Sequence, residues 1–340
     1  MQKFIKNITG IFSWMPVNQL IKISGQRLIF PFYHTVSETP PPHLKHVYPV
    51  KTPAVFKKDI CRLLKHFQPV SVEDVLKHVR EAQPIKKNAF LLTFDDGLKE
   101  IYHHVAPFLK QKGIPAVFFI NTDFMDNKDL FFRYKASLVA EAYLKNPDKA
   151  AGKAILQKLA PYGMAKSSVK LSVLGVDYAH KAVLDELAPL VQTDFTGFLA
   201  AEQPYLTTPQ ISELVQDGFH IGSHSPDHPL FSRLHPEEQL AAITESLDVL
   251  QQNFNLPYRL FSFPFTDFGV RKALFEQLFH PQQPVLDASF GTAGIKNDIT
   301  PFHFQRIPVE TGIPLWFILK TEYLYYLLKG VFGRNTVVRK

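Results

Sequence analysis

Two adjacent carboxylates, Asp95 and Asp96, follow an apolar run of residues 89–94 and precede Gly97. An Asp-Gly pair after a strand commonly forms a tight turn, and a turn alone would account for this stretch. Two neighbouring carboxylates can also divide the work of hydrolysis, because one can hold a cation while the other accepts a proton from water. The pair therefore indicates hydrolytic chemistry if further cation ligands lie nearby.

Two histidines, His224 and His228, are separated by three residues in the stretch HSPDHP. They follow a short apolar segment, residues 219–223, and their spacing lets both imidazoles converge from one turn. Two neutral imidazoles and one carboxylate form a set that binds Zn²⁺ or a similar divalent ion and leaves positions open for water and substrate. Because the chain has 14 histidines, this pair alone is weak evidence for a metal site. It becomes stronger evidence when it is considered together with the two aspartates.

Apolar runs that alternate with helical patterns would position both groups. Residues 27–34, 89–94 and 114–120 are typical of buried strands, and segments of helical spacing separate them. This alternation predicts a parallel α/β fold whose strands are covered by helices. It places Asp95 and Asp96 at the carboxyl end of a strand, where barrels and open parallel sheets carry their sites.

Several residues are expected to begin or end helices. Ser71 is a suitable N-cap for one helix, and Gly113 is a suitable stop for another. Thr208 is expected to cap a helix that begins at Pro209, and Gly218 is expected to end it.

The segment from about 125 to 205 is rich in alanine, lysine and leucine and shows no clear strand, which predicts a helical insertion. The expected organisation is an N-terminal extension over residues 1–24 and an α/β domain over residues 25–310 that contains this insertion. A C-terminal amphipathic helix and basic tail are expected over residues 311–340.

The two patterns together resemble the motifs of the polysaccharide deacetylases with a NodB homology domain, carbohydrate esterase family 4. The first family motif is similar to residues 93–97, and the second is similar to His224, Ser225 and His228. The resemblance covers most of residues 25–310 apart from the insertion. It implies a distorted (β/α)₇ barrel.

The resemblance also implies roles for these residues. Asp96, His224 and His228 would hold a divalent metal, with Zn²⁺ as the first choice and Co²⁺ or Ni²⁺ as alternatives, and Asp95 would be the catalytic base. The reaction would remove N-acetyl groups from amino sugars of a polysaccharide or glycolipid. Two alternatives are hydrolysis of a non-sugar amide at the same site and an inactive carbohydrate-binding protein; the four intact residues argue against inactivity.

The general acid is not in its usual place, because no late Leu-x-His motif follows Arg306. The early stretch FPFYHTV resembles the Tyr-His element of deacetylases whose motif order is circularly permuted, in which the acid is on the first strand. His34 is therefore the predicted acid. His303 is its rival, and a histidine that merely caps a strand end is the structural alternative for His34.

The third family motif is altered in this chain, which reads FSFPFTDFG from Phe261 to Gly269. Pro264 and Phe265 match the wall of the substrate groove, but Ser262 stands where the family has an arginine that contacts the base. We count Arg306, together with Pro264 and Phe265, among the substrate-binding candidates. Arg306 could also replace the missing arginine from a neighbouring strand. Asp287 is interpreted as a structural strand-end residue.

Composition limits the partners. The net charge of +7 would suit an anionic membrane surface or an acidic glycan. The lysines are scattered and no nucleic-acid-binding motif accompanies them, so we expect no nucleic-acid partner. The single cysteine, Cys61, excludes an internal disulfide and is expected to be a buried structural thiol.

The two ends of the chain bear on location. The N-terminal segment has an interrupted apolar run and no small-residue cleavage site, so no secretion signal is expected. Residues 315–332 are strongly apolar but contain Lys320 and Glu322 and are too short to span a bilayer. We expect a docking helix there, with peripheral contact to an inner membrane as the alternative, and a cytoplasmic protein without a transmembrane helix.

Overall fold

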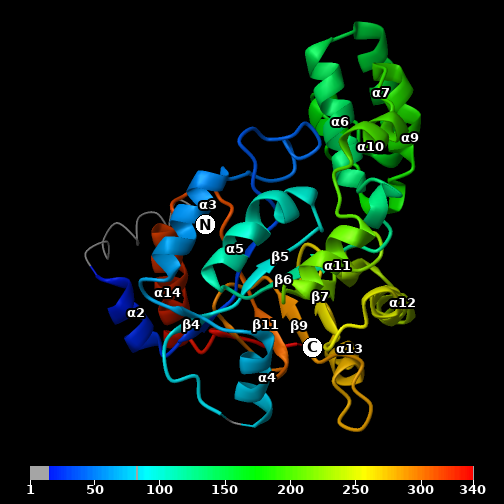
Figure 1. Ribbon diagram of the computed structural model, residues 1–340. Coiled ribbons are helices and arrows are strands. Elements are labelled where there is room, and N and C mark those ends of the chain that lie inside the picture. The colour runs from blue at the N-terminus through cyan, green and yellow to red at the C-terminus, as the bar shows by residue number, and fades with distance from the viewer. Residues whose placement is uncertain (1–14, 82, 340) are drawn as a thin grey trace.

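The computed structural model describes residues 15–81 and 83–339, and parallel strands lie at its centre (Figure 1). The strands of the main sheet are β2 (Pro31–Tyr33), β5 (Leu92–Phe94), β6 (Ala116–Ile120), β7 (His220–Ser223), β8 (Leu260–Ser262), β9 (Ala288–Gly291), β11 (His303–Gln305) and β12 (Ile307–Pro308). Shorter strands form a parallel trio, β1 (Leu28–Ile29), β3 (Gln68–Pro69) and β4 (Ala89–Phe90), and a pair, β10 (Asn297–Asp298) and β13 (Thr336–Val337).

One interrupted strand closes the main sheet. The strand order is β11-β9-β8-β7-β6-β5-β2-β12, so β11 and β12 are the two edges. Only Arg306 separates them in the sequence; β11 pairs with β9, whereas β12 pairs with β2. The two edges therefore form one broken strand, and the sheet becomes a barrel with seven strand positions. The predicted distorted (β/α)₇ barrel is confirmed.

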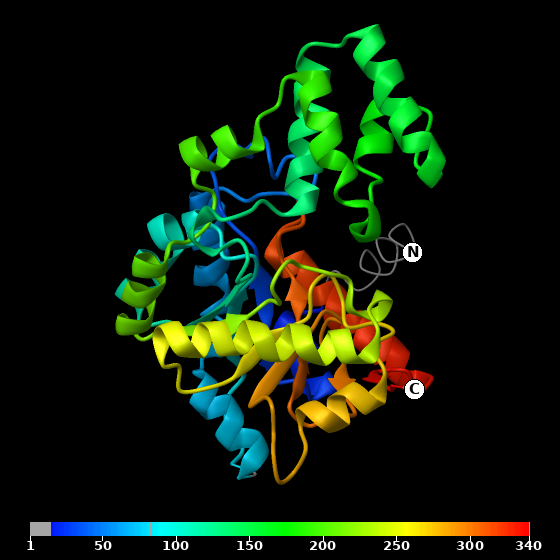
Figure 2. The same cartoon turned by 90° about the vertical axis from the view of Figure 1, so that its right-hand side faces the viewer.

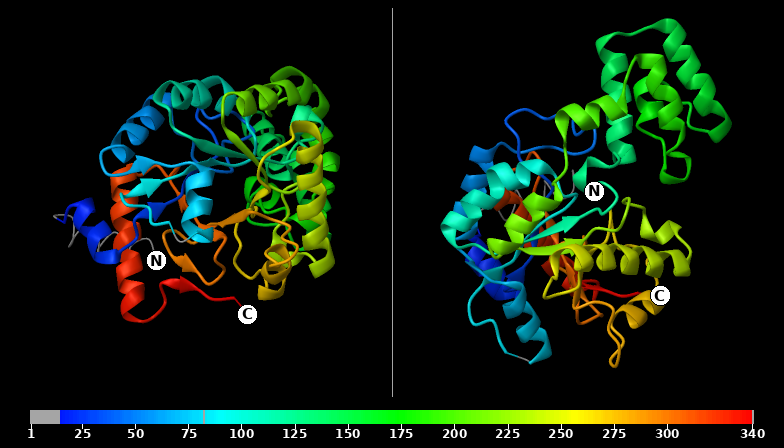
Figure 3. Two further views of the ribbon diagram at one scale, coloured as in Figure 1. Left: turned by 60° about the horizontal axis from the view of Figure 1, so that its bottom comes forward. Right: turned by 45° about the vertical axis from the view of Figure 1, so that its right-hand side comes forward.

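Helices surround the barrel (Figure 3). The helices outside the insertion are α2 (Val17–Ser24), α3 (Pro53–Leu63), α4 (Val72–Arg80), the π-helical η1 (Ile101–Val105), α5 (Ala106–Lys112), α11 (Thr208–Gln216), the 3₁₀ turn η6 (Phe231–Arg233), α12 (Pro236–Phe254), α13 (Lys272–Leu278) and α14 (Leu315–Val331). Their apolar faces and the strands share a core that includes Phe94, Phe118 and Ile221. Burial of these faces holds the strand ends, and so the site, in place.

Most of the expected caps occur where the sequence placed them. The Ser71 side chain accepts a hydrogen bond from the Asp74 amide at the start of α4, and Gly113 ends α5 with a left-handed φ of 62°. Helix α11 differs by one residue, because its N-cap is Thr207 rather than Thr208. The Thr207 amide donates to the Gln210 side chain, as in a capping box.

The insertion is helical, as predicted, and stands on one end of the barrel (Figure 2). It contains α6 (Phe132–Lys145), α7 (Lys149–Leu159), α8 (Val169–Val173), α9 (Val183–Leu187), α10 (Phe195–Glu202) and the short turns η2 (Met125–Asn127), η3 (Ala160–Tyr162), η4 (Tyr178–His180) and η5 (Ala188–Val191). Its apolar cluster includes Val139, Ile155 and Leu184 and extends to Leu44 and Tyr205 at the barrel. The insertion therefore has a core of its own that is continuous with the loops of the barrel end.

The C-terminal helix α14 docks on the protein. Leu315, Leu319 and Tyr323 are buried in the main core, and α14 lies beside α2 (Figure 1). Within the described residues, no helix combines the length and apolar character needed to cross a membrane. Peripheral membrane contact stays a prediction, as does the expected division of the chain at residues 24 and 310. The predicted burial of Cys61 is wrong, because its position on α3 faces solvent.

Candidate active site

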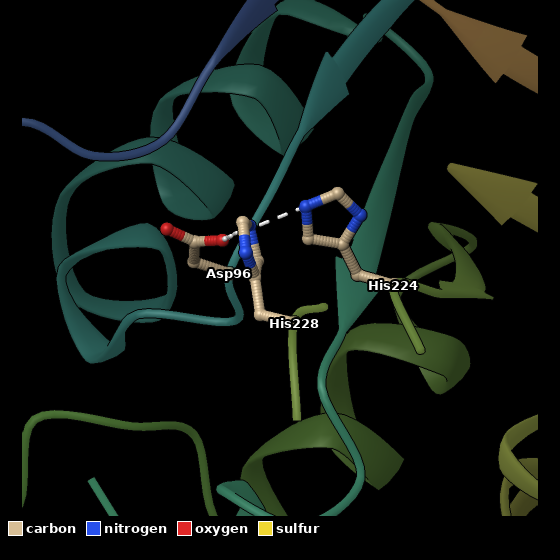
Figure 4. Close-up of side chains that lie close together, drawn as sticks. All are labelled: Asp96, His224 and His228. Atoms are coloured by element: carbon tan, nitrogen blue, oxygen red, sulfur yellow. Dashed lines mark ion pairs between the residues drawn. The ribbon is translucent and has the colours of Figure 1, made fainter. Parts of the chain in front are cut away.

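Asp96, His224 and His228 converge at the carboxyl ends of β5 and β7 (Figure 4). The Nε2 atoms of His228 and His224 lie 3.4 and 3.6 Å from the Oδ1 atom of Asp96. All three side chains are buried. The fold thus brings together the three residues that the sequence suggested as ligands.

The loops that carry these residues have an unusual backbone. Asp96, Ser225 and His228 have left-handed φ angles of 71°, 70° and 63°. Such angles are uncommon for non-glycine residues and cost on the order of 1 kcal/mol or more each, so the surrounding packing must impose them. The Ser225 side chain accepts a hydrogen bond from the His228 amide, which fixes the second loop. Backbone strain of this kind is concentrated at functional sites.

The donor atoms fit a divalent cation. One carboxylate oxygen of Asp96, Oδ2, accepts hydrogen bonds from Tyr134 at 2.7 Å and Tyr48 at 3.3 Å. The other, Oδ1, is buried and has no hydrogen-bond partner among the described residues. The Nδ1 atom of His224 lies 2.7 Å from the Ser262 carbonyl oxygen, which places the proton on Nδ1 and leaves Nε2 free. A buried oxygen without a partner that faces an imidazole nitrogen is the arrangement that a cation completes.

The protonation states agree with this fit. Burial lowers the pKa of His224 to about 4, although Asp95 opposes the change. Burial would raise the pKa of Asp96, but the adjacent His228, with His34 and His224, holds that pKa well below its usual range. Near neutral pH, the His224 imidazole is therefore neutral and the Asp96 carboxylate is ionised, and these are the forms that bind metal.

Asp95 is held by a buried arginine. Arg306 makes two parallel contacts of 2.7 Å to the two carboxylate oxygens of Asp95, and it is fully buried. It also donates to the Ser262 side chain at 2.7 Å. Burial would raise the pKa of Asp95, but the Arg306 guanidinium lowers it, so the carboxylate is ionised. Arg306 comes from the gap between β11 and β12 and occupies the space behind Asp95.

The placement of Arg306 corrects one expectation. Arg306 was counted among the substrate-binding candidates, but its guanidinium is buried against Asp95 and does not line the pocket. Substrate cannot contact it there. The other role suggested for Arg306, beside the base, matches its position, and Ser262 stands in hydrogen-bond contact with it where the family arginine would be.

His34 faces the same pocket from the end of β2. Its Nδ1 atom lies 2.6 Å from Glu310, whose other carboxylate oxygen accepts from the His34 amide at 2.7 Å. The His34 ring stacks on Tyr48 with 4.2 Å between ring centroids. Burial would lower the pKa of His34, but the Glu310 carboxylate, with smaller effects of Asp96 and Asp95, raises it to about 9. His34 is therefore a protonated group near neutral pH.

His303, the rival acid, lies elsewhere. Its ring nitrogens lie 2.6 Å from the Ser289 hydroxyl and 3.1 Å from the Asp267 carboxylate, and it does not line the pocket. Asp267, Asp298 and His303 are close enough to hold an ion, but Arg339 contacts both carboxylates at 2.6 Å. A guanidinium of the C-terminal tail therefore already contacts the carboxylates to which a cation would bind.

The pocket that these groups share has a volume of about 290 Å³. Phe265 lines it and is 40% exposed, whereas Pro264 precedes it without lining the pocket. The helical insertion supplies Phe131, Arg133 and Leu174 to the lining of the pocket, and Phe131 and Arg133 lie next to Phe265. The insertion therefore forms part of the surface that substrate would meet.

Three of the residues that contact the catalytic groups escaped the sequence analysis. Glu310 lies beside His34 because β12 pairs with β2 in parallel with Pro308 opposite Phe32, and this register is set by closure of the barrel rather than by a local pattern in the sequence. Tyr48 and Tyr134 come from a loop and from the insertion and carry no local signal.

A parallel barrel that gathers acids and histidines at its strand ends is an arrangement suited to hydrolysis, and these side chains could hold a metal ion. Residues 82–277 match the family model for polysaccharide deacetylases. The match spans more than half of the chain, so the chain belongs to the polysaccharide deacetylase family. It is accordingly a hydrolase that acts on the carbon–nitrogen amide bonds of acetylated sugars. Among curated proteins, none matches the chain.

Solved structures of low sequence identity share the fold. The Streptococcus pyogenes deacetylase PplD in complex with acetate is 14% identical, with a TM-score of 0.53 over 87% of this chain and 97% of that chain. IcaB from Ammonifex degensii is 16% identical, with a TM-score of 0.53 over 87% of this chain and 96% of that chain. These similarities concern the fold of the barrel.

Proposed function

We propose that the protein removes N-acetyl groups from amino sugars of a polysaccharide or glycolipid and needs a divalent cation to do so. The observation that carries the proposal is the buried Oδ1 atom of Asp96, which faces the Nε2 atoms of His224 and His228 and has no hydrogen-bond partner in the described part of the chain. Two imidazoles and a carboxylate favour Zn²⁺, with Co²⁺ or Ni²⁺ as alternatives.

Each residue then has a distinct task. The cation, held by Asp96, His224 and His228, would supply the acidity that lets water attack an amide near neutral pH. Asp95, kept ionised by Arg306, accepts a proton from the attacking water. His34, kept protonated by Glu310, donates a proton to the amide nitrogen as the carbon–nitrogen bond breaks. The products are acetate and the free amino sugar.

The position of Arg306 supports an active enzyme rather than an inactive carbohydrate-binding protein. The altered third motif, with Ser262 in place of arginine, was the reason to consider inactivity. Arg306 supplies a guanidinium to Asp95 from another strand, and Ser262 accepts a hydrogen bond from it. The base therefore has the cationic partner that the substitution seemed to remove. No observation favours a non-sugar amide as substrate.

Metal removal tests the proposal directly. The protein should release acetate from an N-acetylated amino-sugar oligosaccharide, lose this activity on dialysis against a chelator, and regain it when Zn²⁺ or Co²⁺ is added back. Acetate release and metal content are measured on the same samples. Full activity in protein shown by elemental analysis to be free of metal would contradict the proposed cation dependence.

His34→Ala tests the acid. The amine of an acetamide needs a proton to leave, whereas the phenolate of an aryl acetate hardly does. The variant should keep its metal and slow acetamide hydrolysis by about 10² or more, while aryl acetate hydrolysis falls by less than about tenfold. Equal losses on both substrates would show that His34 is not the acid. If His303→Gln alone gave the selective loss, the rival would be the acid.

A further inference from the structure

Arg133 is a cation of the insertion that reaches the catalytic pocket. It lies in the first turn of α6 and lines the pocket together with Phe265 and Leu174. Its side chain is half-buried and forms no ion pair within the described part of the chain. Arg133 Nη1 donates to the Leu174 carbonyl oxygen at 3.1 Å, so most of its five N–H groups stay available.

Aromatic rings fix the position of this guanidinium. The Cζ atom of Arg133 lies 5.3 Å from the centroid of the Phe132 ring and 5.8 Å from that of Phe265. Both distances are within the range of cation–π attraction. Phe265 belongs to the loop that follows β8, which we call the groove-wall loop. Arg133 therefore bridges the insertion and the barrel at the edge of the pocket. A guanidinium held in one orientation loses little freedom when it binds a planar anion.

The other acidic and basic side chains of the pocket, apart from the three candidate metal ligands, lie beside ion-pair partners. Asp95 is paired with Arg306, His34 with Glu310, and His46 with Glu141 at 2.6 Å. The charge of Asp96 would be offset by the cation of the proposed function. Burial lowers the pKa of Arg133 and the charge of Asp177 opposes this change, but Asp177 makes its ion pair with His180 rather than with Arg133. Arg133 therefore provides positive charge that no group of the described pocket neutralises.

We infer that Arg133 forms a subsite for an anionic group, a carboxylate or a phosphate, that the substrate carries beside its N-acetylated sugar. This inference rests on the proposed function for the identity of the reacting group, but the anion subsite is a separate property of the insertion. A partly buried, unpaired guanidinium costs folding free energy, and an oxyanion of the substrate would supply the missing partner. The insertion thus selects acidic glycans or glycan phosphates over neutral ones.

A purely structural role is the alternative. Arg133 could serve only to hold Leu174 and the groove-wall loop through its hydrogen bond and ring contacts. In that case its loss would disturb every substrate alike. The two roles are therefore separated by comparing substrates that differ in charge but share the N-acetylglucosamine unit.

The experiment measures kcat/KM for acetate release from four probes. The carboxylate probe is a hyaluronan tetrasaccharide, and its neutral counterpart is N-acetylated chitotetraose. The phosphate probe is N-acetylglucosamine 1-phosphate, and its neutral counterpart is the methyl glycoside of N-acetylglucosamine. Wild-type protein should prefer one anionic probe over its neutral counterpart, and Arg133→Gln should reduce that preference by about 10- to 100-fold, as expected for a charge-assisted bidentate contact. Arg133→Lys should recover part of it. Arg62→Gln on α3, which removes the same charge outside the pocket, should leave the preference unchanged.

Binding measured by calorimetry on metal-free protein separates this inference from the proposed function. Weaker binding of the preferred anionic probe to Arg133→Gln supports the subsite even if no probe is deacetylated, in which case the proposed function alone fails. Deacetylation without any preference for an anionic probe, or an equal loss on charged and neutral probes, overturns the subsite alone. The identity of the preferred probe decides between carboxylate and phosphate.

Discussion

Replacing His224 by alanine should abolish stoichiometric binding of a divalent cation and, with it, acetate release. The His224 Nε2 atom faces the buried Asp96 Oδ1 atom at 3.6 Å, and His224 is one of the two imidazoles that lie with Asp96 in the candidate ligand group. Loss of the transition-state charge stabilisation of a metal amounts to several kcal/mol, which corresponds to at least about 10³-fold in kcat/KM. Metal content by elemental analysis and turnover of the N-acetylated oligosaccharide are the two measurements.

A histidine of the same strand provides the control. His220 begins β7, which ends just before His224, but it contacts Glu73 outside the pocket. His220→Ala should keep both metal and activity, whereas Asp96→Ala and His228→Ala should behave as His224→Ala. Full metal occupancy in His224→Ala would show that the three residues are not the ligand set.

Asp95→Asn should keep the metal and lower kcat by about 10²- to 10⁴-fold, the usual range of a general base. The amide cannot accept the proton of the attacking water, but its shape is close to that of the carboxylate. Because Arg306 is fully buried and loses the anionic partner that it has among the described residues, we also expect a lower free energy of unfolding, by roughly 3 kcal/mol. Kinetics at saturating substrate, metal analysis and urea denaturation measure these effects separately.

A comparison of Asp96→Asn with Asp95→Asn distinguishes the metal ligand from the catalytic base. Asp96→Asn should lose metal, since Asp96 Oδ1 would lose its negative charge, while Asp95→Asn should not. If Asp95→Asn lost the metal and Asp96→Asn kept it, the roles assigned to the two residues would be reversed. Far-ultraviolet circular dichroism of both variants shows whether a loss of activity reflects unfolding instead.

Local patterns in the sequence determined much of the architecture. The alternation of apolar runs with helical spacing predicted a parallel α/β fold, because strands that are covered on both faces must be apolar and their crossover helices must have one apolar face. The resemblance to the deacetylases implied that this fold is a barrel. The same patterns placed Asp95, Asp96, His224 and His228 at strand ends, and parallel strands bring their carboxyl ends to one side. Helix caps also depend on local sequence. For this reason Ser71 was identified correctly as an N-cap, and the predicted N-cap of α11 differs from the observed one by only one residue.

The exposure of a single helical side chain was harder to predict than the helix that carries it. Cys61 lies in a helix whose pattern is amphipathic, and its thiol was expected in the core. The helix faces Ile60 inward and leaves Cys61 in solvent. The side chains of successive helical residues point about 100° apart, so the residue next to a buried one can lie outside the apolar face and be exposed to solvent.

Only the tertiary structure decided which partners complete the site. Glu310 meets His34 across 276 residues of sequence, and Arg306 meets Asp95 across 211. Both contacts exist because β11 and β12 form one broken strand that closes the barrel and carries Arg306 at the break. Arg133 likewise reaches the pocket because the insertion packs on the loops of the barrel end. Residue types and spacing specify each strand end, but the pairing of the first strand with the last depends on closure of the whole sheet, which no local pattern encodes.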